Sequence, residues 1–383
     1  MKKKILFAIP TLDSGGAEKV LTEIVKALDH SRYEIFVFTL FNQGVYREEI
    51  GNSVNYYFAF NISKKDDAIS KLVNRIKRAL VRHLPAKWFY CLFIKKEKYD
   101  VEIAFLEGWI TKFLAASDNK SAKKIAWIHT DLIENPHADF AFKNSTAHEE
   151  AYRSYDKIIC VSEQVKCQFE SKFSNLVKER SSLVYYNPVD RNEILKQAEL
   201  PICEKEWDEN KFNIVVVGRL EPVKGQERLI RVLNELIDSE TKFCVHFLGE
   251  GTQREELQNM SQALIAAGRC QFWGYQKNPY RFIGKADLCV CPSYAEGFSL
   301  IVVEALVLNR LVLATNCAGP AEVLENGKYG YLCENSEEGI KNALEKIMEN
   351  TTFLKEKYRT NEVSWKFDIV PTIERIEKEL LEG

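Results

Sequence analysis

Short apolar runs alternate with amphipathic stretches along almost the whole chain. The runs are rich in Val, Ile, Leu and Phe, which is typical of strands buried on both faces of a parallel sheet. Between them, apolar residues recur three and four positions apart, which predicts helices. We expect strands at residues 5–9, 34–40, 101–105, 124–128, 157–161, 212–217, 243–248, 271–273, 287–291 and 311–314. This alternation predicts an α/β fold with parallel sheets.

Two carboxylates eight residues apart follow the expected strand at 287–291. Glu296 falls in a loop beside Gly297, and Glu304 falls in the second turn of the helix expected next. A helix start offers free backbone N–H groups and the positive end of the dipole to an anion. The pair therefore suits a sugar joined to a nucleoside diphosphate, with each carboxylate on a different part of the ligand.

Two other interpretations of this pair stay open on spacing alone. In a chain with 28% charged residues, two Glu at this distance often arise by chance. They could also be the acid and nucleophile of a glycosidase, whose carboxyl groups lie about 5–9.5 Å apart. Eight helical residues would separate them by about 12 Å, which disfavours hydrolysis, although a bent loop would shorten the distance.

Two cations stand at the carboxyl end of the expected strand at 212–217. Arg219 follows Gly218 directly, and Lys224 comes five residues later. Ligands of open α/β sheets bind outside the carboxyl ends of the strands, where Arg and Lys can hold a diphosphate. Taken alone, both could be solvated loop cations. Together with the two glutamates, they favour a nucleotide-sugar site.

The first expected strand leads into a glycine-rich turn. Gly15 and Gly16 precede a helical pattern, and adjacent glycines let the backbone approach a ligand closely at a helix start. Glu18 fits a first-turn carboxylate favoured by the helix dipole better than a catalyst. A lone histidine at a strand end, such as His129 after the strand at 124–128, is more often structural than catalytic.

These motifs together resemble those of family 4 of the retaining glycosyltransferases, which have the two-domain GT-B architecture. The resemblance extends from Lys4 to the last helix. It rests on the E-x7-E motif at Glu296 and Glu304, on Arg219 and Lys224, on Gly15-Gly16-Ala17-Glu18, on His129, and on Phe272-Trp273-Gly274-Tyr275.

The resemblance implies two Rossmann-like domains facing a central cleft, with a C-terminal helix that crosses back to the first domain. We expect an acceptor domain at 1–190, a linker at 191–210, a donor domain at 211–364 and the crossover helix at 365–383. A length of 383 residues gives each domain room for its own core.

The resemblance also implies roles for individual residues in transferring a sugar from a nucleotide donor with retention. The implied catalytic residues are Glu296, Arg219, Lys224 and His129. Implied donor-binding residues are Gly16, Gly218, Arg219, Lys224, Gly249, Tyr275, Glu296, Gly297, Phe298, Ser299 and Glu304. Glu107 and Asp131 are acceptor-binding candidates. No metal or cofactor is expected, because Arg, Lys and helix ends meet the phosphate charge.

The leading donor is a UDP-hexose or UDP-N-acetylhexosamine, with GDP-mannose as the second choice. The expected acceptor is a hydroxyl of a bacterial cell-surface glycan precursor, lipid-linked or polymeric. A net charge of −2, from 53 basic and 55 acidic residues, argues against a nucleic-acid partner. The ten cysteines lack metal-ligand spacing, and we see no signal peptide and no apolar run of membrane-spanning length. We therefore expect a cytoplasmic protein.

A basic segment at 64–98 holds eleven Lys and Arg against three acidic residues. Lys71, Arg75, Arg78 and Arg82 recur along one helical face, with apolar residues elsewhere on the helix. Such a helix, followed by Trp88-Phe89-Tyr90, favours peripheral contact with anionic lipid or with a lipid diphosphate, on the inner face of the membrane. The alternative is a solvated helix that packs on the protein by its apolar side.

Two other function classes compete with the transferase. One is a nucleotide-sugar epimerase of the same architecture, which needs no acceptor. The other is a non-catalytic partner subunit that only binds sugar nucleotides. The basic helix argues against the epimerase, and the intact Arg, Lys and Glu residues argue against the idle subunit. A product that contains the acceptor would separate all three.

Overall fold

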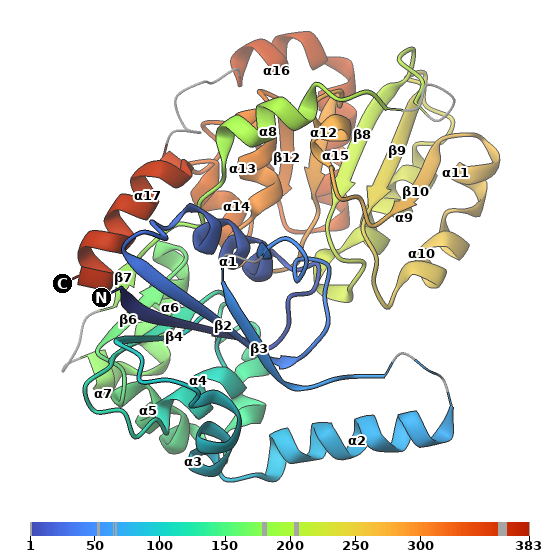
Figure 1. The fold of residues 1–383 in the computed structure, drawn as a ribbon. Helices are drawn as coiled ribbons and strands as arrows, with labels where there is room; N and C mark the ends of the chain where they lie inside the picture. The colour runs from blue at the N-terminus through green and yellow to red at the C-terminus, as the bar shows by residue number, and fades with distance from the viewer. Residues whose placement is uncertain are drawn as a thin grey trace. The chain divides into compact units, whose positions relative to one another are not determined.

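A computed structural model describes residues 2–51, 54–63, 65, 67–177, 182–202, 207–358 and 366–382. The chain forms two compact units, each with its own parallel sheet (Figure 1). Unit 1 comprises Met1–Pro188 and Ile369–Gly383, and unit 2 comprises Val189–Asp368. The expected α/β class with two Rossmann-like domains is confirmed.

Unit 1 has a seven-stranded sheet in the order β3-β2-β1-β4-β5-β6-β7. Its strands are β1 (Lys3–Ile9), β2 (Tyr33–Phe41), β3 (Asn55–Phe60), β4 (Val101–Ala104), β5 (Lys123–Ile128), β6 (Lys157–Cys160) and β7 (Leu183–Val184). Its α-helices are α1 (Gly16–Ala27), α2 (Ala68–His83), α3 (Ala86–Phe89), α4 (Trp109–Ala115), α5 (Ser145–Arg153), α6 (Glu163–Lys172), α7 (Ser174–Val177) and α17 (Ile369–Arg375).

Unit 2 has a six-stranded sheet in the order β10-β9-β8-β11-β12-β13. Its strands are β8 (Phe212–Val217), β9 (Phe243–Leu248), β10 (Cys270–Gly274), β11 (Leu288–Cys291), β12 (Leu311–Thr315) and β13 (Tyr331–Cys333). Its α-helices are α8 (Arg191–Ala198), α9 (Gln226–Glu235), α10 (Arg254–Met260), α11 (Gln262–Ala266), α12 (Tyr280–Ile283), α13 (Leu300–Val307), α14 (Ala318–Val323), α15 (Glu337–Glu349) and α16 (Thr351–Lys357).

The central strands of unit 2 carry the apolar runs seen in the sequence. β8 pairs in parallel with β9 and β11, and Ile214, Val245 and Leu288 are fully buried. Because parallel strands point the same way, the loops after β8, β9, β10, β11 and β12 emerge at one edge of the sheet. That edge holds the predicted donor residues of unit 2.

Part of the range expected to be a linker is helical. Helix α8 begins after Asp190, whose side chain caps it by accepting from Glu193 N, and it packs on α12 and α13 within unit 2. Ile194 is its buried anchor, which the charged composition of the segment obscured. Residues 203–206 lie outside the described residues.

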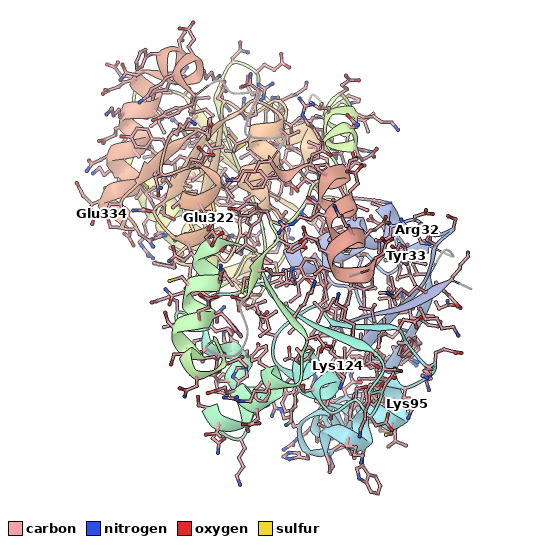
Figure 2. The ribbon with its side chains drawn as sticks, turned by 90° about the vertical axis from the view of Figure 1, so that its left-hand side faces the viewer. Arg32, Tyr33, Lys95, Lys124, Glu322 and Glu334 are labelled. Atoms are coloured by element: carbon pink, nitrogen blue, oxygen red, sulfur yellow. The ribbon has the colours of Figure 1, made fainter. Side chains whose placement is uncertain are left out.

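The C-terminal segment belongs to unit 1, as expected, and α17 begins at Ile369. The expected start of the crossover helix at 365 lies outside the described residues. Helix α17 continues as a π-helix over Ile376–Glu382. Arg32 Nη1 donates to Glu377 Oε2 at 3.0 Å, and Tyr33 OH donates to Glu382 Oε1 at 3.0 Å. Figure 2 labels Arg32 and Tyr33 beside the C-terminal helical segment.

Helix α2 extends away from the sheet of unit 1 (Figure 1), and two of its polar side chains bond to the loop that precedes it. Asn74 Nδ2 donates to Ser63 O at 2.9 Å, and Lys77 Nζ donates to Asn61 O at 2.6 Å. The exposed side chains include five apolar ones, at Ile69, Leu72, Val73, Ile76 and Leu80. Val81 is the buried apolar side chain of α2, so most of its apolar residues face solvent and do not pack on the protein.

Candidate functional site

The carboxyl ends of β8, β9 and β10 lie backbone against backbone. Gly218 N donates to Leu248 O at 3.0 Å, and Gly249 N donates to Gly274 O at 2.8 Å. Gly249 has a φ of +147°, and a Cβ there would lie 2.0 Å from Gly218 O, so only glycine fits. The predicted residues Gly218, Gly249 and Tyr275, which follows Gly274, are thus brought to one edge.

Lys224 and Glu296 are 72 positions apart in the chain and form an ion pair. Lys224 Nζ donates to Glu296 Oε1 at 2.6 Å, and Ser293 Oγ donates to the same oxygen at 2.9 Å. The two charged side chains are only 23% and 12% exposed. Partial burial strengthens their attraction relative to an open-surface pair. Sequence reasoning missed Ser293.

The backbone of the Glu296 loop is held from β12 and α14. Thr315 Oγ1 donates to Ser293 O at 2.6 Å, and Gly319 N donates to Glu296 O at 2.9 Å. A Cβ on Gly319 would lie 2.7 Å from Phe298 Cα, so the close approach requires glycine. Sequence reasoning missed Gly319 as well, although Gly-Pro at 319–320, shortly after an apolar run, is a recognisable turn signal.

Glu304 lies in α13 as expected and is buried. Tyr280 OH donates to Glu304 Oε1 at 3.4 Å, a partner that the sequence did not reveal. Ser299 is the N-cap residue of α13, but its hydroxyl does not cap the helix and instead contacts Cys291 Sγ at 3.5 Å. The backbone N–H groups at this helix start therefore have no side-chain cap, which suits an anion.

Arg219 is the predicted residue that stands apart from this cluster. Its backbone is fixed, because Gln226 Nε2 donates to Arg219 O at 3.0 Å. Its side chain is exposed, and no described residue forms a hydrogen bond or ion pair with the guanidinium. Arg219 therefore offers its donors to solvent or to a ligand.

In unit 1, the predicted residues follow the neighbouring strands β1, β4 and β5. Helix α1 begins at Gly16, and the Glu18 carboxylate folds back against Gly15 at the helix start, where the dipole favours a negative charge. Glu107 lies beside His129, since its Oε2 accepts from His129 N at 3.0 Å. Glu107 Oε1 accepts from Thr130 Oγ1 at 2.5 Å.

His129 is 8% exposed, and no described residue is a hydrogen-bond partner for its Nε2. Burial lowers its pKa to about 3, so the ring is neutral at pH 7. Burial also raises the pKa of Glu107. Asp131 Oδ1 accepts from Ile133 N and Glu134 N at 2.8 and 3.0 Å, which gives this acceptor candidate a local role in shaping its own loop.

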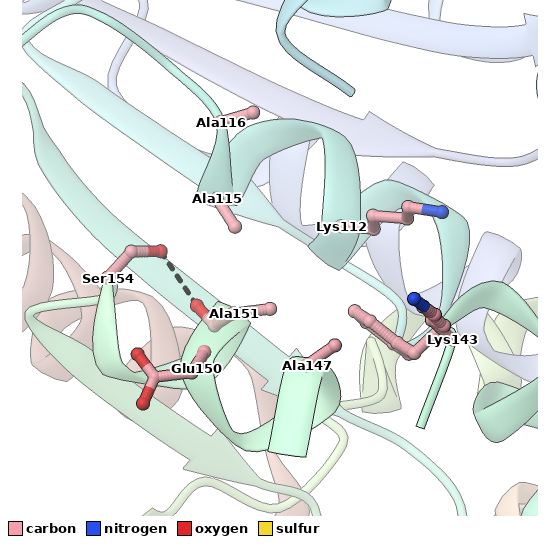
Figure 3. A pocket seen from close by; sticks show the side chains of 9 residues that line it. Lys112, Ala115, Ala116, Lys143, Ala147, Glu150, Ala151 and Ser154 are labelled. Atoms are coloured by element: carbon pink, nitrogen blue, oxygen red, sulfur yellow. Dashed lines mark hydrogen bonds between the residues drawn. The ribbon is translucent and has the colours of Figure 1, made fainter. Parts of the chain in front are cut away.

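A cavity of about 350 Å³ lies elsewhere in unit 1, between α4 and α5. Lys112 and Lys143 flank one end of it, and alanines line its wall (Figure 3). It contains none of the predicted site residues. Within the described ranges, no group of three or more His, Cys, Asp or Glu side chains is placed to hold a metal ion, and no helix is long and apolar enough to span a bilayer.

Family comparisons agree with the two units. Residues 14–193 match the family described as Glycosyltransferase Family 4, and residues 202–363 match Glycosyl transferases group 1. The two matches together extend over most of the chain, which is therefore a glycosyltransferase with a family 4 match in unit 1 and a group 1 match in unit 2. The ion-paired Lys224 and Glu296, and Glu304, all fall within the second match.

Curated relatives of this glycosyltransferase are distant. An uncharacterized glycosyltransferase of Methanocaldococcus jannaschii is 28% identical over 217 residues, covering 56% of this chain and 53% of that protein. A lipopolysaccharide 1,6-galactosyltransferase of Escherichia coli is 25% identical over 262 residues, covering 67% of this chain and 66% of that protein. The chain thus spans from about half to just under two thirds of these two relatives.

A crystal structure of Anabaena HepE in complex with UDP and glucose shares the fold. The TM-score is 0.75, the sequence identity is 20%, and the match covers 100% of both chains. This similarity confirms the GT-B fold of the glycosyltransferase.

Proposed function

We propose that this glycosyltransferase moves a hexose or N-acetylhexosamine from a UDP-linked donor to a hydroxyl of a cell-surface glycan precursor, with retention of anomeric configuration. The observation that carries the proposal is the ion pair of Lys224 and Glu296 at the carboxyl edge of the unit 2 sheet. The similarity to a lipopolysaccharide galactosyltransferase and to a fold neighbour that binds UDP and glucose supports the choice of donor and acceptor.

In this proposal, cations stabilise the leaving diphosphate. When the bond between the sugar C1 and the phosphate oxygen breaks, negative charge builds on the diphosphate. Lys224 can share its three N–H donors between Glu296 and a phosphate oxygen, and Arg219 can add a bidentate contact. Such preorganised charge lowers the barrier without a metal ion, so we propose a metal-independent reaction.

The two glutamates would bind different parts of the donor. Glu296 lies in the loop and would accept hydrogen bonds from the sugar hydroxyls, beside the backbone of Gly297 and Phe298. Glu304 is fixed by Tyr280 and would bind the ribose hydroxyls, with Tyr275 near the base. The acceptor hydroxyl would attack C1 from the same face from which the diphosphate departs and would pass its proton to the departing phosphate oxygen. Attack from this face retains the anomeric configuration.

Unit 1 would supply Gly16 and His129. The neutral His129 ring has an Nε2 without a described protein partner, so it can hydrogen-bond a sugar hydroxyl. Glu107 holds the backbone of His129 in place, so we propose that it orients this histidine rather than binding the acceptor directly.

A nucleotide-release screen tests this function. Purified protein is incubated with a panel of UDP- and GDP-sugars, with and without membrane extract. Wild type is compared with Glu296→Ala and with the control Glu235→Gln, which changes the last residue of α9. We expect UDP release from one donor that needs extract, is lost in Glu296→Ala and is kept in the control. Conversion of a donor to its epimer without extract would establish the epimerase instead. No turnover of any donor would favour the idle subunit.

We also propose that α2 lies on an anionic membrane surface. Its apolar side chains at Ile69, Leu72, Val73, Ile76 and Leu80 are exposed, while Lys71, Arg75, Arg78 and Arg82 form a separate basic face. A helix of this kind buries its apolar face among the acyl chains while its cations meet anionic headgroups. The enzyme would then meet lipid-linked acceptors from the cytoplasmic face.

Vesicle sedimentation tests the membrane contact. Each Lys or Arg near an anionic surface contributes about 1 kcal/mol, so Arg75→Gln with Arg78→Gln should weaken binding to phosphatidylglycerol vesicles about 30-fold. Leu72→Ser with Ile76→Ser should abolish binding. Phe353→Ser, which changes an exposed apolar residue of unit 2, serves as the control and should bind like wild type. Equal binding of all variants would refute the contact.

A further inference from the structure

Arg228 is a fully buried cation directly behind the Glu296 loop. Its side chain is in α9, and the residue is 1% exposed. Nε and Nη2 both donate to Pro292 O, at 2.9 and 2.5 Å. The guanidinium carbon lies 3.9 Å from the centre of the Tyr294 ring, so the planar group stacks on the aromatic face.

The segment 223–228, which leads into α9, is joined to the Glu296 loop at three points. Arg228 holds Pro292, Val223 O accepts from Tyr294 N at 2.9 Å, and Lys224 holds Glu296 itself. Gly225 makes this close approach possible. It has a φ of +66°, and a Cβ there would lie 2.2 Å from Pro292 O.

The Tyr294 side chain is fixed at its other end. Its hydroxyl donates to Glu227 Oε1 at 2.8 Å, so Glu227 and Arg228 hold the ring from its hydroxyl and from its face. A buried charge is costly unless it is hydrogen-bonded, and removing a partner from such a network leaves polar groups unpaired. The observed geometry therefore confines the loop strongly.

We propose that Arg228 is a positioning residue that sets the place of the Glu296 carboxylate through the loop at 292–296. This inference rests on the proposed role of Glu296 in holding the donor sugar. A lysine at this position keeps the charge but has neither the flat group that stacks on Tyr294 nor the two parallel donors for Pro292 O. Arg228→Lys should therefore loosen the loop without removing a charge.

The test compares Arg228→Lys with a matched control, Arg269→Lys. Arg269 Nη1 also donates to a backbone carbonyl, Thr241 O at 3.2 Å, and its guanidinium carbon lies 4.9 Å from the centre of the Phe243 ring. It stands directly before β10, at the opposite edge of the same sheet. UDP affinity is measured by calorimetry, and kcat and KM are measured with the UDP-sugar that wild type uses.

We expect Arg228→Lys to lower kcat by about 10- to 100-fold, because a displacement of about 1 Å at a reacting centre has an effect of this size. UDP affinity should stay within twofold, since Glu304 and the base contacts are untouched. In a Glu296→Gln background, adding Arg228→Lys should cause no further loss, because both act through one carboxylate. Additive losses, an unchanged kcat, or a parallel loss of UDP binding would overturn the proposal.

Hydrogen exchange of residues 292–299, measured without nucleotide, separates this proposal from the proposed function. We expect Arg228→Lys to raise exchange at least tenfold there and Arg269→Lys to leave it unchanged. If wild type transfers no sugar but this difference is found, the positioning role of Arg228 stands and the proposed function fails. Equal exchange in wild type and Arg228→Lys would refute the positioning role, whatever the activity.

Discussion

Removing both partners of the Lys224–Glu296 pair should cost less stability than the two single losses added together, and it should restore no activity. Lys224→Met leaves the Glu296 carboxylate with only the Ser293 hydroxyl among its described side-chain partners, and Glu296→Gln leaves the ammonium without its counter-charge. Hydrogen bonds to charged groups contribute about 1.5–3 kcal/mol, and this pair is largely shielded from water. We expect each single variant to lower the free energy of unfolding by about 1–2 kcal/mol. The double variant should lose less than the sum, with a coupling of about 1–2 kcal/mol.

Activity should not recover in the double variant, because Lys224 and Glu296 are proposed to contact different parts of the donor. Losing one stabilising group around a developing charge costs about 10²- to 10³-fold in kcat. We expect such a loss in both single variants and no recovery in the double variant. Urea unfolding at pH 7.5 gives the stability, and UDP release gives the activity.

The pair of Lys341 and Glu235 is the control. Its atoms are 2.8 Å apart, but the side chains are 34% and 59% exposed, so its coupling should stay below about 0.5 kcal/mol with full activity. A Lys224–Glu296 coupling no larger than that of the control would refute the reasoning. So would recovery of activity in the double variant.

Three further predictions concern stability. Gly319→Ala should destabilise by about 1–3 kcal/mol in thermal unfolding, because its Cβ would lie 2.7 Å from Phe298 Cα, although Gly→Ala normally stabilises a helix. Burial lowers the pKa of His246, whose Nδ1 accepts from Trp273 Nε1, to about 4. The stability gained from keeping His246 neutral in the folded state is present above pH 6.5 and is lost toward pH 4. Between pH 7.5 and 5, the free energy of unfolding in urea should therefore fall by about 2 kcal/mol more in wild type than in His246→Gln. Asp67→Ala removes the N-cap of α2, so hydrogen exchange at 68–75 should rise about fivefold.

Long apolar runs made most of the fold predictable. The run at 212–217 is rich in β-branched residues and the run at 243–248 is mostly apolar, and the structure has strands at the same residues. Sequence analysis missed β3, β7 and β13. β7 and β13 have only two and three residues, too few for a periodic pattern, and β3 is partly exposed at the sheet edge. Packing decides such short elements, and local sequence does not reveal it.

The placing of predicted residues at one edge of the sheet could be predicted from the strand ends. Gly218, Lys224 and Glu296 stand in segments that follow apolar runs, and parallel strands bring their carboxyl ends to one edge. Their roles in a site stay predictions. Contacts between side chains far apart in sequence were not predictable. The hydrogen bonds of Arg228 to Pro292 O, for example, join residues 64 positions apart. For α2, the pattern revealed an amphipathic helix but not which face turns outward.

Product analysis with an α-linked UDP-sugar tests the central claim most directly. The acceptor product formed by wild type is purified, weighed by mass spectrometry and examined by proton NMR at the anomeric position. We predict an acceptor that has gained one sugar in α-linkage, with none formed by Glu296→Ala. A β-linked product would contradict retention, and an epimerised donor with unmodified acceptor would contradict transfer itself.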